Sequence, residues 1–435
     1  MNNSISRRRF LAGSAIATAA FYIGRSSSFG QGKSANDKLN LGVIGTHNRA
    51  GSNIKGVQGQ NIVAICDIDD NFLSATGKTF PEAKRYSDFR KLLEQKNLDG
   101  VVISTTDHTH AFATAAALKL GLHVYCEKPL THDIHETRVI TKLAAANKKL
   151  ATQMGTQIHA TNNYRRVVEL IQSGAIGSVS EVHIWLEKSR VGGKPAAASP
   201  VPKSLHWDLW MGPAPERPYN SDYHARNWRA YWNFGSGTLG DMGCHYLDLP
   251  FWALNLQVPT AIEAKGPPID AEITPPWIVA HYDFAARGKS PAVKLTWRDG
   301  CEAGIGGTKP DFVTSGKVPD WRNGVLFIGD KGMLVADYGK YKLLPDNKFV
   351  GFTPPAESIP NSIGHYEEWF EGCKHGTPTS CNFGYGALLT ETVQLGNVAF
   401  RTGKKIEWDA AAMKAKNAPE AANFLQRDYR KGWTL

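Results

Sequence analysis

The feature that most constrains this fold is a strand, turn, helix and strand pattern near the start of the chain. Residues 39–44 are a short apolar run, residues 45–51 contain a glycine-rich turn, and residues 62–66 are a second apolar run that ends at Asp67. Buried runs of this length, separated by a helical stretch, are typical of parallel strands joined by a crossover helix. The pattern therefore predicts a βαβ unit, the repeating element of doubly wound α/β sheets.

The same alternation continues beyond the first unit. Apolar strands are expected at residues 100–104 and 123–126, and an alanine-rich helix is expected between them at residues 111–120. A succession of such units builds an open parallel sheet that binds ligands outside the carboxyl ends of its strands. We therefore predict a Rossmann domain over residues 36–156.

The turn after the first strand resembles a dinucleotide site, with one departure. Gly45 and Ala50 occupy the first and third small positions of the GxGxxG pattern, but His47 stands where a second glycine would allow the closest approach to a pyrophosphate. Asp67 ends the second strand, where a carboxylate accepts hydrogen bonds from the ribose hydroxyls and repels a 2′-phosphate. NAD is thus favoured over NADP, and a plain turn or helix-cap aspartate is the alternative for Asp67.

Polar residues after the later strands complete the predicted cofactor site, because the carboxyl ends of parallel strands meet at one edge of a sheet. No metal site is predicted, since His108 and His110 lack further ligands in their neighbourhood and the six cysteines show no CxxC spacing. Export would permit disulfides, and Cys373 and Cys381 are the closest pair in sequence. The residues expected to contact NAD are Gly45, Thr46, His47, Asn48, Arg49, Ala50, Asp67, Ser104, Thr105, Asp107, His110, Glu127 and Lys128.

The first residues are interpreted as a targeting segment. Ser6-Arg7-Arg8-Arg9-Phe10-Leu11 is a twin-arginine pattern, and the apolar run at residues 12–23 that follows is shorter than the ~20 residues needed to span a bilayer. We expect a signal peptide over residues 1–31, export by the twin-arginine route to the periplasm, and no stable membrane insertion.

The net charge is compatible with either of two interpretations. The formal value of +10 includes four arginines of the leader, so the remaining chain is only mildly basic. Such a surface favours acidic glycans, or it is simply a solvated face. No nucleic-acid partner is predicted.

The second half, residues 157–435, is expected to be an α+β domain with an open, mostly antiparallel sheet. Residues 179–187 alternate between apolar and polar side chains, as a half-buried strand does. Aromatic residues gather between residues 207 and 252, where they either line a carbohydrate site or pack a core. Further strands are expected at residues 261–264, 278–284, 292–297 and 324–328, helices at 366–373 and 388–401, and a mobile loop near the site at 190–202.

Several motifs together resemble the family of glucose-fructose oxidoreductase, inositol dehydrogenase and MocA. They are the βαβ start, the stretch from Thr106 to His110, Glu127-Lys128-Pro129, Gly174-Ala175-Ile176-Gly177, and the stretch from Asp241 to Asp248. With the leader in front, the chain is similar to exported bacterial members. The resemblance implies that Lys128 contacts the reacting hydroxyl, that Asp241 and His245 complete the catalytic site, and that the open sheet pairs subunits in a homo-oligomer, a dimer or a tetramer.

The chemistry of alcohol oxidation agrees with this assignment. Removing the hydroxyl proton requires a base within hydrogen-bond reach of that oxygen. His245 titrates near neutrality, and a neighbouring NAD⁺ ring would favour the neutral form of Lys128. Either side chain is a candidate base; Lys128 is favoured, with His245 as its partner or relay and Asp241 as hydroxyl acceptor and orienter.

Three functions are compatible with these residues. The first is an NAD-dependent oxidoreductase for a sugar or sugar-derived secondary alcohol, whose cofactor is tightly bound and recycled because no abundant NAD pool exists outside the cytoplasm. The second is a glycosidase or lyase that acts by transient oxidation and elimination. The third is a non-catalytic protein that retains the cofactor, supported only by His47.

Overall fold

In the computed structural model, residues 38–195 and 197–435 are described, and the predicted signal peptide at residues 1–31 lies outside them. The first half contains a six-stranded sheet in the order β3-β2-β1-β4-β5-β6, and all of its strand pairs are parallel. This is the doubly wound sheet that the repeated βαβ pattern predicts. Its strands are β1 (Asn40–Ile44), β2 (Asn61–Cys66), β3 (Lys84–Tyr86), β4 (Gly100–Ile103), β5 (His123–Cys126) and β6 (Thr152–Met154).

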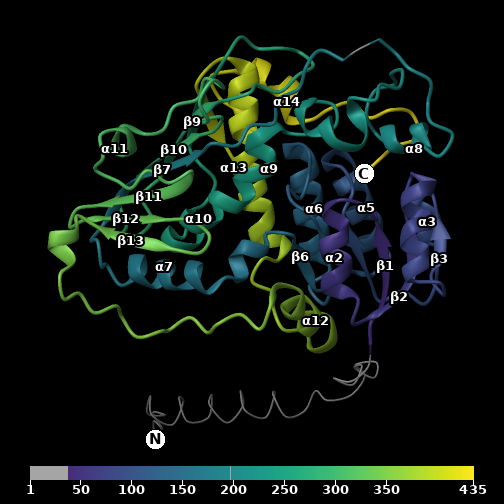
Figure 1. Cartoon of the computed structure of the whole chain (residues 1–435), viewed down its shortest axis with the longest axis horizontal. Coiled ribbons are helices and arrows are strands. Elements are labelled where there is room, and N and C mark those ends of the chain that lie inside the picture. Colours follow the sequence, from purple (N-terminus) through teal and green to yellow (C-terminus); the bar gives the residue numbers. More distant parts are fainter. Residues whose placement is uncertain (1–37, 196) are drawn as a thin grey trace, which may run out of the picture. The chain divides into compact units, whose positions relative to one another are not determined.

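Helices cover both faces of this sheet (Figure 1). Successive side chains of a strand point to opposite faces, so Val101 packs in one apolar cluster and Val102 in another. The sheet is therefore buried on both sides, which explains its continuous apolar runs. The crossover helices are α2 (Arg49–Val57), α3 (Asp70–Thr79), α4 (Phe89–Leu92), α5 (Asp107–Lys119) and α6 (Ile134–Ala146).

The second half is built on a nine-stranded sheet in the order β13-β12-β11-β7-β10-β9-β8-β14-β15. Among the described residues, only β7 and β10 pair in parallel in this sheet, and its other strand pairs are antiparallel, as predicted for this half. Its strands are β7 (Val179–Leu186), β8 (Ala261–Lys265), β9 (Val279–Phe284), β10 (Val293–Arg298), β11 (Asn323–Gly329), β12 (Met333–Ala336), β13 (Tyr341–Leu344), β14 (Ile406–Asp409) and β15 (Lys414–Ala415).

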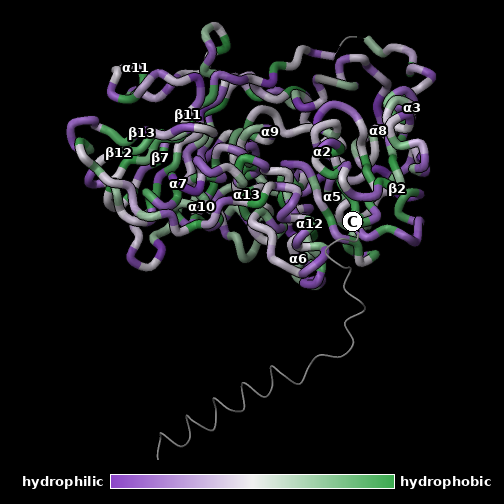
Figure 2. The backbone as a smooth tube through the Cα atoms, turned by 60° about the horizontal axis from the view of Figure 1, so that its bottom comes forward, coloured by the Kyte–Doolittle hydropathy of each residue, from purple (hydrophilic) through white to green (hydrophobic). Residues whose placement is uncertain are grey.

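One long helix, α13 (Phe383–Thr402), joins the two halves. It packs on α6 of the first half and on α9 of the second, and Figure 2 shows hydrophobic backbone segments gathered in the interior around it. The sequence predicted this helix only from residue 388; it begins five residues earlier because the side chain of Asn382 caps the backbone N–H of Tyr385.

The remaining helices are short. They are α7 (Asn162–Gln172), α8 (Trp207–Met211), α9 (Gly237–Tyr246), α10 (Asp248–Leu254), α11 (Asp311–Thr314), α12 (His365–His375), α14 (Ala422–Leu425) and the single turns η1 (Gln157–Ala160), η2 (Tyr223–Asn227), η3 (Trp228–Ala230), η4 (Asp346–Phe349) and η5 (Pro419–Ala421). Among the described residues, no helix is both long and apolar enough to cross a membrane. All six cysteines are free, so Cys373 and Cys381 form no disulfide.

Candidate functional site

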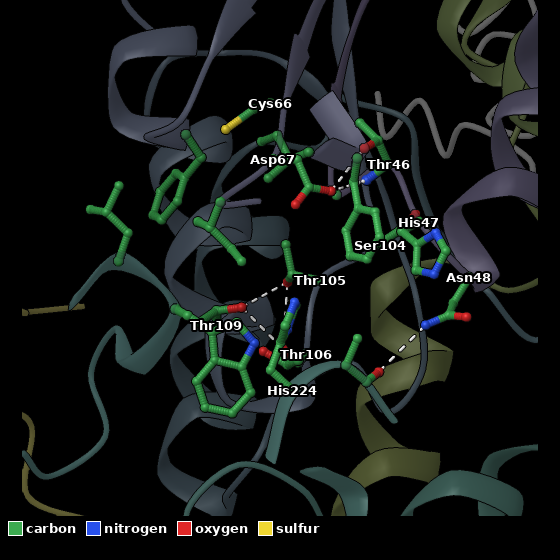
Figure 3. A pocket seen from close by; sticks show the side chains of 18 of the residues that line it. Thr46, His47, Asn48, Cys66, Asp67, Ser104, Thr105, Thr106, Thr109 and His224 are labelled. Carbon is green, nitrogen blue, oxygen red and sulfur yellow. Dashed lines mark hydrogen bonds between the residues drawn. The ribbon is translucent and has the colours of Figure 1, made fainter. Parts of the chain in front are cut away.

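The first turn of the parallel sheet is fixed to the end of the second strand. Gly45 adopts φ 87°, and a Cβ at this position would lie 2.6 Å from the carbonyl oxygen of Ser104, so only glycine fits without strain. Next to it, the backbone N–H and the hydroxyl of Thr46 both donate to Oδ2 of Asp67 at 2.8 Å (Figure 3). The turn and the carboxylate therefore lie side by side, as a dinucleotide site requires.

The rest of the turn leads into the amino end of α2. Asn48 has φ 54° and makes no side-chain cap to this helix, so no side chain of the cap residue occupies the place where an anion binds. His47 is exposed, and its ring stacks on Phe72 with centroids 3.8 Å apart. The guanidinium Nε of Arg49 donates to Oε1 of Glu127 at 2.8 Å. These features fit the diphosphate of a dinucleotide, with Arg49 in a supporting role.

A cleft of about 950 Å³, counting its open mouth, extends from this turn. Gly45 to Arg49, Asp67 and Ser104 to Thr106 line one side of it. The opposite side comes from the second half of the chain, through Trp210, His224 and Trp228, and from the C-terminal tail through Trp433.

The segment of residues 204–234, here called the cap, supplies the side of this cleft that faces the parallel sheet. Its backbone is hydrogen-bonded to the residues that follow β2. The N–H of Asp70 donates to the carbonyl of Ser204, and the N–H of His206 donates to the carbonyl of Ile68, both at 2.9 Å. On the other side of the cleft, both ring nitrogens of His108 lie at hydrogen-bond distance from backbone carbonyls of the cap. These contacts explain why His108 offers no nitrogen to a metal.

Most aromatic residues of the cap pack against one another. Trp207, Tyr223, Tyr231 and Phe234 are buried in a common apolar cluster, which confirms the core interpretation for them. The tail holds the cap in place: Arg430 donates to the carbonyl of Gly212 at 3.0 Å and to that of Asp208 at 2.8 Å.

At the end of β5, Glu127 and Lys128 point into different surroundings. Glu127 is buried and accepts hydrogen bonds from Arg49 and from Asn53. Burial acts to raise the pKa of Glu127, but the charges of Arg49 and Lys128 hold it below its usual value. Glu127 thus fixes the loop that carries Lys128, and Asn53 is a supporting residue that no sequence motif indicates.

Lys128 reaches across to the second half of the chain. Its Nζ donates to Oδ1 of Asp241 at 2.9 Å and also to the backbone carbonyl of Asp241. The Lys128 side chain is only 9% exposed. The structure therefore brings together two of the three predicted catalytic residues.

Asp241 is surrounded by cations. Besides Lys128, Oδ1 lies 3.1 Å from Nε of Arg229, and Oδ2 lies 2.8 Å from Nε of Arg190 and 3.5 Å from Nζ of Lys188. Burial acts to raise the pKa of Asp241, but the four surrounding cations hold it well below its usual value. Asp241 is consequently ionised and orients Lys128 rather than accepting protons.

His245 lies one turn further along α9 and is buried. Burial and the nearby charge of Lys128 hold the pKa of His245 well below its usual value. Within the described residues, its Nδ1 has no hydrogen-bond partner. His245 is therefore a neutral imidazole at neutral pH, and its Nδ1 is left for a ligand to contact.

Asp107 and His110, at the start of α5, are not among the residues that line the cleft, and neither are Lys128, Asp241 and His245. Asp107 is buried, its Oδ2 has no partner among the described residues, and burial raises its pKa to about 7. The ring nitrogens of His110 lie 2.7 Å from the carbonyl of Pro129 and 3.2 Å from that of Thr105. His110 thus positions the loop beside Lys128, whereas Ser104 and Thr105 do line the cleft.

One buried group with metal-ligating side chains lies elsewhere. His159, Asp248 and Cys381 have candidate ligand atoms within 4.8 Å of one another. His159 already bonds to Asp248 at 2.8 Å, and burial raises the pKa of the Cys381 thiol well above its usual value. The phenol of Tyr385 also donates to Asp248, so these side chains form a hydrogen-bonded network in the core.

Sequence reasoning missed the cations around Asp241. The sequence predicts Arg190 only as part of a loop near the site, and Lys188 and Arg229 lie in no recognisable motif. Lys188 follows the end of β7, and Arg229 lies in the cap shortly before α9. The fold brings both segments next to Asp241 on α9.

Comparison with known proteins agrees with both halves of the fold. The model of an oxidoreductase family described as an NAD-binding Rossmann fold matches residues 39–155. The model of a C-terminal alpha/beta domain of the same oxidoreductase family matches residues 163–435.

Among individual relatives, an inositol 2-dehydrogenase of Salmonella typhimurium is 31% identical over 148 residues, which cover 33% of this chain and 43% of that protein. The chain thus spans less than half the length of this curated relative. The WlbA dehydrogenase of Chromobacterium violaceum, solved with NADH and UDP-GlcNAcA, has a TM-score of 0.62 at 14% identity, covering 88% of this chain and 99% of that one. The myo-inositol 2-dehydrogenase of Lactobacillus plantarum has a TM-score of 0.56 at 16% identity, covering 86% and 100%. At such identities the two structures show the shared fold alone.

Proposed function

This chain belongs to the oxidoreductase family of glucose-fructose oxidoreductase, inositol dehydrogenase and MocA, and on that premise we propose that it is an NAD-dependent oxidoreductase acting on a secondary hydroxyl of a sugar or sugar derivative. The observation that carries the proposal is the buried pair of Lys128 and Asp241, which joins the cofactor-binding half to the other half at 2.9 Å. Because Asp241 holds the ammonium of Lys128 in one place, a substrate hydroxyl that binds to this ammonium is also held in one place.

The side chains divide the work of alcohol oxidation. When bound, NAD⁺ supplies the acceptor for the two electrons that leave the alcohol carbon. Lys128 donates a hydrogen bond to the substrate oxygen, and Asp241 keeps the ammonium in place. His245, neutral at neutral pH, accepts the hydroxyl proton. The alternative is that Lys128 takes the hydroxyl proton and passes it to His245.

The direct test is reduction of the cofactor on the enzyme. Purified protein loaded with NAD⁺ is mixed with a panel of sugars, polyols and sugar acids, and the absorbance of NADH is followed. A substrate-dependent signal is expected for at least one of them. Absence of any signal across the panel, with NAD⁺ present at one per chain, contradicts the proposal.

We also propose that the cofactor stays bound through export to the periplasm and is recycled on the enzyme. The twin-arginine pattern of the leader supports export, and the cap supports retention, because it bridges the end of β2 and the start of α5 over the cleft. The small molecules released when undialysed protein is heat-denatured are to be identified by mass spectrometry. Stoichiometric NAD or NADH is expected, and its absence contradicts tight retention.

The tail provides a matched pair of variants for retention. Arg430→Ala removes the hydrogen bonds to the cap, whereas Lys431→Ala changes an exposed neighbour. We expect faster cofactor loss from the first variant only. Equal loss from both means that the tail does not hold the cap.

Oxidation followed by elimination is a second candidate function. Such a route needs a second base to take the C–H proton, and Lys128 and His245 are the two candidate bases of this site. A glycoside substrate distinguishes the two functions, because only elimination releases the leaving group.

We further propose that the outer face of the nine-stranded sheet pairs subunits in a homo-oligomer. On β9 and β10 this face presents the exposed side chains of His281 and Lys294, whereas the opposite face is packed in the core. Light scattering is expected to give a dimer or tetramer, and Lys294→Glu is expected to shift it toward the monomer. A wild-type monomer contradicts the proposal.

A further inference from the structure

The cations around Asp241 outnumber the charge that they surround. Lys128, Lys188, Arg190 and Arg229 all lie within ion-pair distance of a single carboxylate. Across residues 38–195 and 197–435, no other carboxylate is paired with any of the four. The other acids nearby do not balance them, because Glu127 is paired with Arg49 and Asp107 has a pKa of about 7.

One cation would suffice to keep Asp241 ionised. Lys128 already provides it, from a side chain that is 9% exposed. Gathering three further cations around a buried carboxylate costs free energy, through mutual repulsion and partial desolvation. Such an arrangement is stable at low cost only when a further anion enters it.

Three of the four cations are partly exposed to solvent. The side chains of Lys188, Arg190 and Arg229 are 40%, 32% and 24% exposed, so part of each is within reach of a ligand. A guanidinium carries five N–H donors in a planar fork, and Asp241 takes only some of them. The remaining donors match the two oxygens of a second carboxylate.

The loop that carries two of these cations is anchored at its root. The backbone N–H of Arg190 donates to Oγ1 of Thr238 at 2.8 Å, and the hydroxyl of Ser189 donates to the carbonyl of Pro276 at 2.5 Å. The positions of Lys188 and Arg190 are therefore set by the fold.

We propose that the substrate is an anionic sugar, and that Lys188 and Arg190 bind its carboxylate while Lys128 and His245 address the hydroxyl that is oxidised. Uronic and aldonic acids have this chemistry. Arg229 lines the cofactor cleft as well as contacting Asp241, so it lies between the two ligands. This inference rests on the proposed function and narrows its substrate class.

The test compares sugars with and without an anionic group, and glucose and glucuronate are the closest pair in shape. NAD-loaded protein is titrated with glucuronate, gluconate, glucose and glucose 6-phosphate, and binding is measured by calorimetry in parallel with NADH absorbance. The acids are expected to bind roughly tenfold or more tightly than glucose, with an affinity that falls as salt is added. Equal binding of glucose and glucuronate overturns the inference, and so does a preference for glucose 6-phosphate, since the anion would then be a phosphate.

Variants locate the carboxylate site. Lys188→Met and Arg190→Gln are each expected to weaken glucuronate binding by about 10- to 100-fold, with a flatter salt dependence. Arg190→Lys keeps the charge but loses the fork and is expected to recover part of the affinity, whereas Lys119→Met, on an exposed end of α5, serves as the control. Unchanged glucuronate affinity in both loop variants overturns the inference.

The outcome for the proposed function is separate. If neutral sugars reduce the cofactor and acids do not, only the anionic substrate is wrong. If no probe of either charge reduces it, the oxidoreductase proposal itself fails.

Discussion

The cofactor cleft and the cation cluster around Asp241 are built in different ways. The turn that begins the cleft depends on backbone geometry. Gly45 needs a positive φ, Thr46 donates its N–H to Asp67, and the side chain of Asn48 makes no hydrogen bond that would cap the start of α2. The cluster depends on side-chain charge brought from several distant parts of the chain. A change in the cleft should therefore affect nucleotide binding and stability together, whereas a change in the cluster should affect turnover and leave the nucleotide bound.

Lys128→Ala is the strongest test of this division. It removes the ammonium that we propose to contact the substrate hydroxyl, and we expect turnover to fall by about 10³-fold or more while fold and bound nucleotide stay intact. Stopped-flow reduction of bound NAD⁺, mass spectrometry of the released nucleotide and circular dichroism measure the three quantities. Near-normal turnover contradicts the assignment of Lys128, and Lys119→Ala on the surface provides the control.

Gly45→Ala tests the other region. Its Cβ would lie 2.6 Å from the Ser104 carbonyl oxygen at φ 87°, so we expect a loss of stability of about 1–3 kcal/mol together with loss of bound NAD. Gly51→Ala is the matched control, because a Cβ there meets nothing within 4 Å inside α2 and should stabilise by about 0.5–1 kcal/mol. Thermal unfolding and nucleotide content are the measurements; a tolerant Gly45→Ala would mean that the turn is not rigid.

Asp107 lies between the two regions, and its titration gives a pH signature. Its pKa of about 7 in the folded protein exceeds the ordinary 3.8, so the native state holds a proton that the unfolded state releases. The stability from this group is full below pH 3.8 and is lost as pH rises through about 7. Asp107→Asn should therefore gain stability relative to wild type between pH 4 and pH 8, measured by urea unfolding. A difference that does not vary with pH means that Asp107 is not buried as a neutral acid.

The sequence was most informative where structure is local. The parallel sheet, the Gly45 turn, Asp67 and the strand that delivers Lys128 all follow from apolar runs and turn residues along consecutive stretches. It was also sufficient to place Asp241 and His245 on one helix, α9, because their spacing is that of a helical turn.

Other parts depend on contacts that no local pattern records. Strands β12 to β15 are at most four residues long, and their apolar pattern is too short to predict them. Arg49, expected to contact the cofactor, lines the cleft and also pairs with Glu127, a contact that arises because β5 brings that carboxylate next to α2. The convergence of Lys188 and Arg229 on Asp241 is equally a property of the folded chain.

The smallest expected effect concerns His47, the residue that departs from the dinucleotide pattern. Its ring stacks on Phe72, and the residue is exposed to solvent. A single exposed stack contributes little, so His47→Ala should change NAD affinity by less than about tenfold. Phe72→Ala removes the partner and should have the same effect if the stack is the whole role of His47. A much larger loss of NAD affinity for His47→Ala than for Phe72→Ala would instead mean that the imidazole contacts the phosphates. NAD binding in the cleft would then depend on a side chain, as the cluster around Asp241 does.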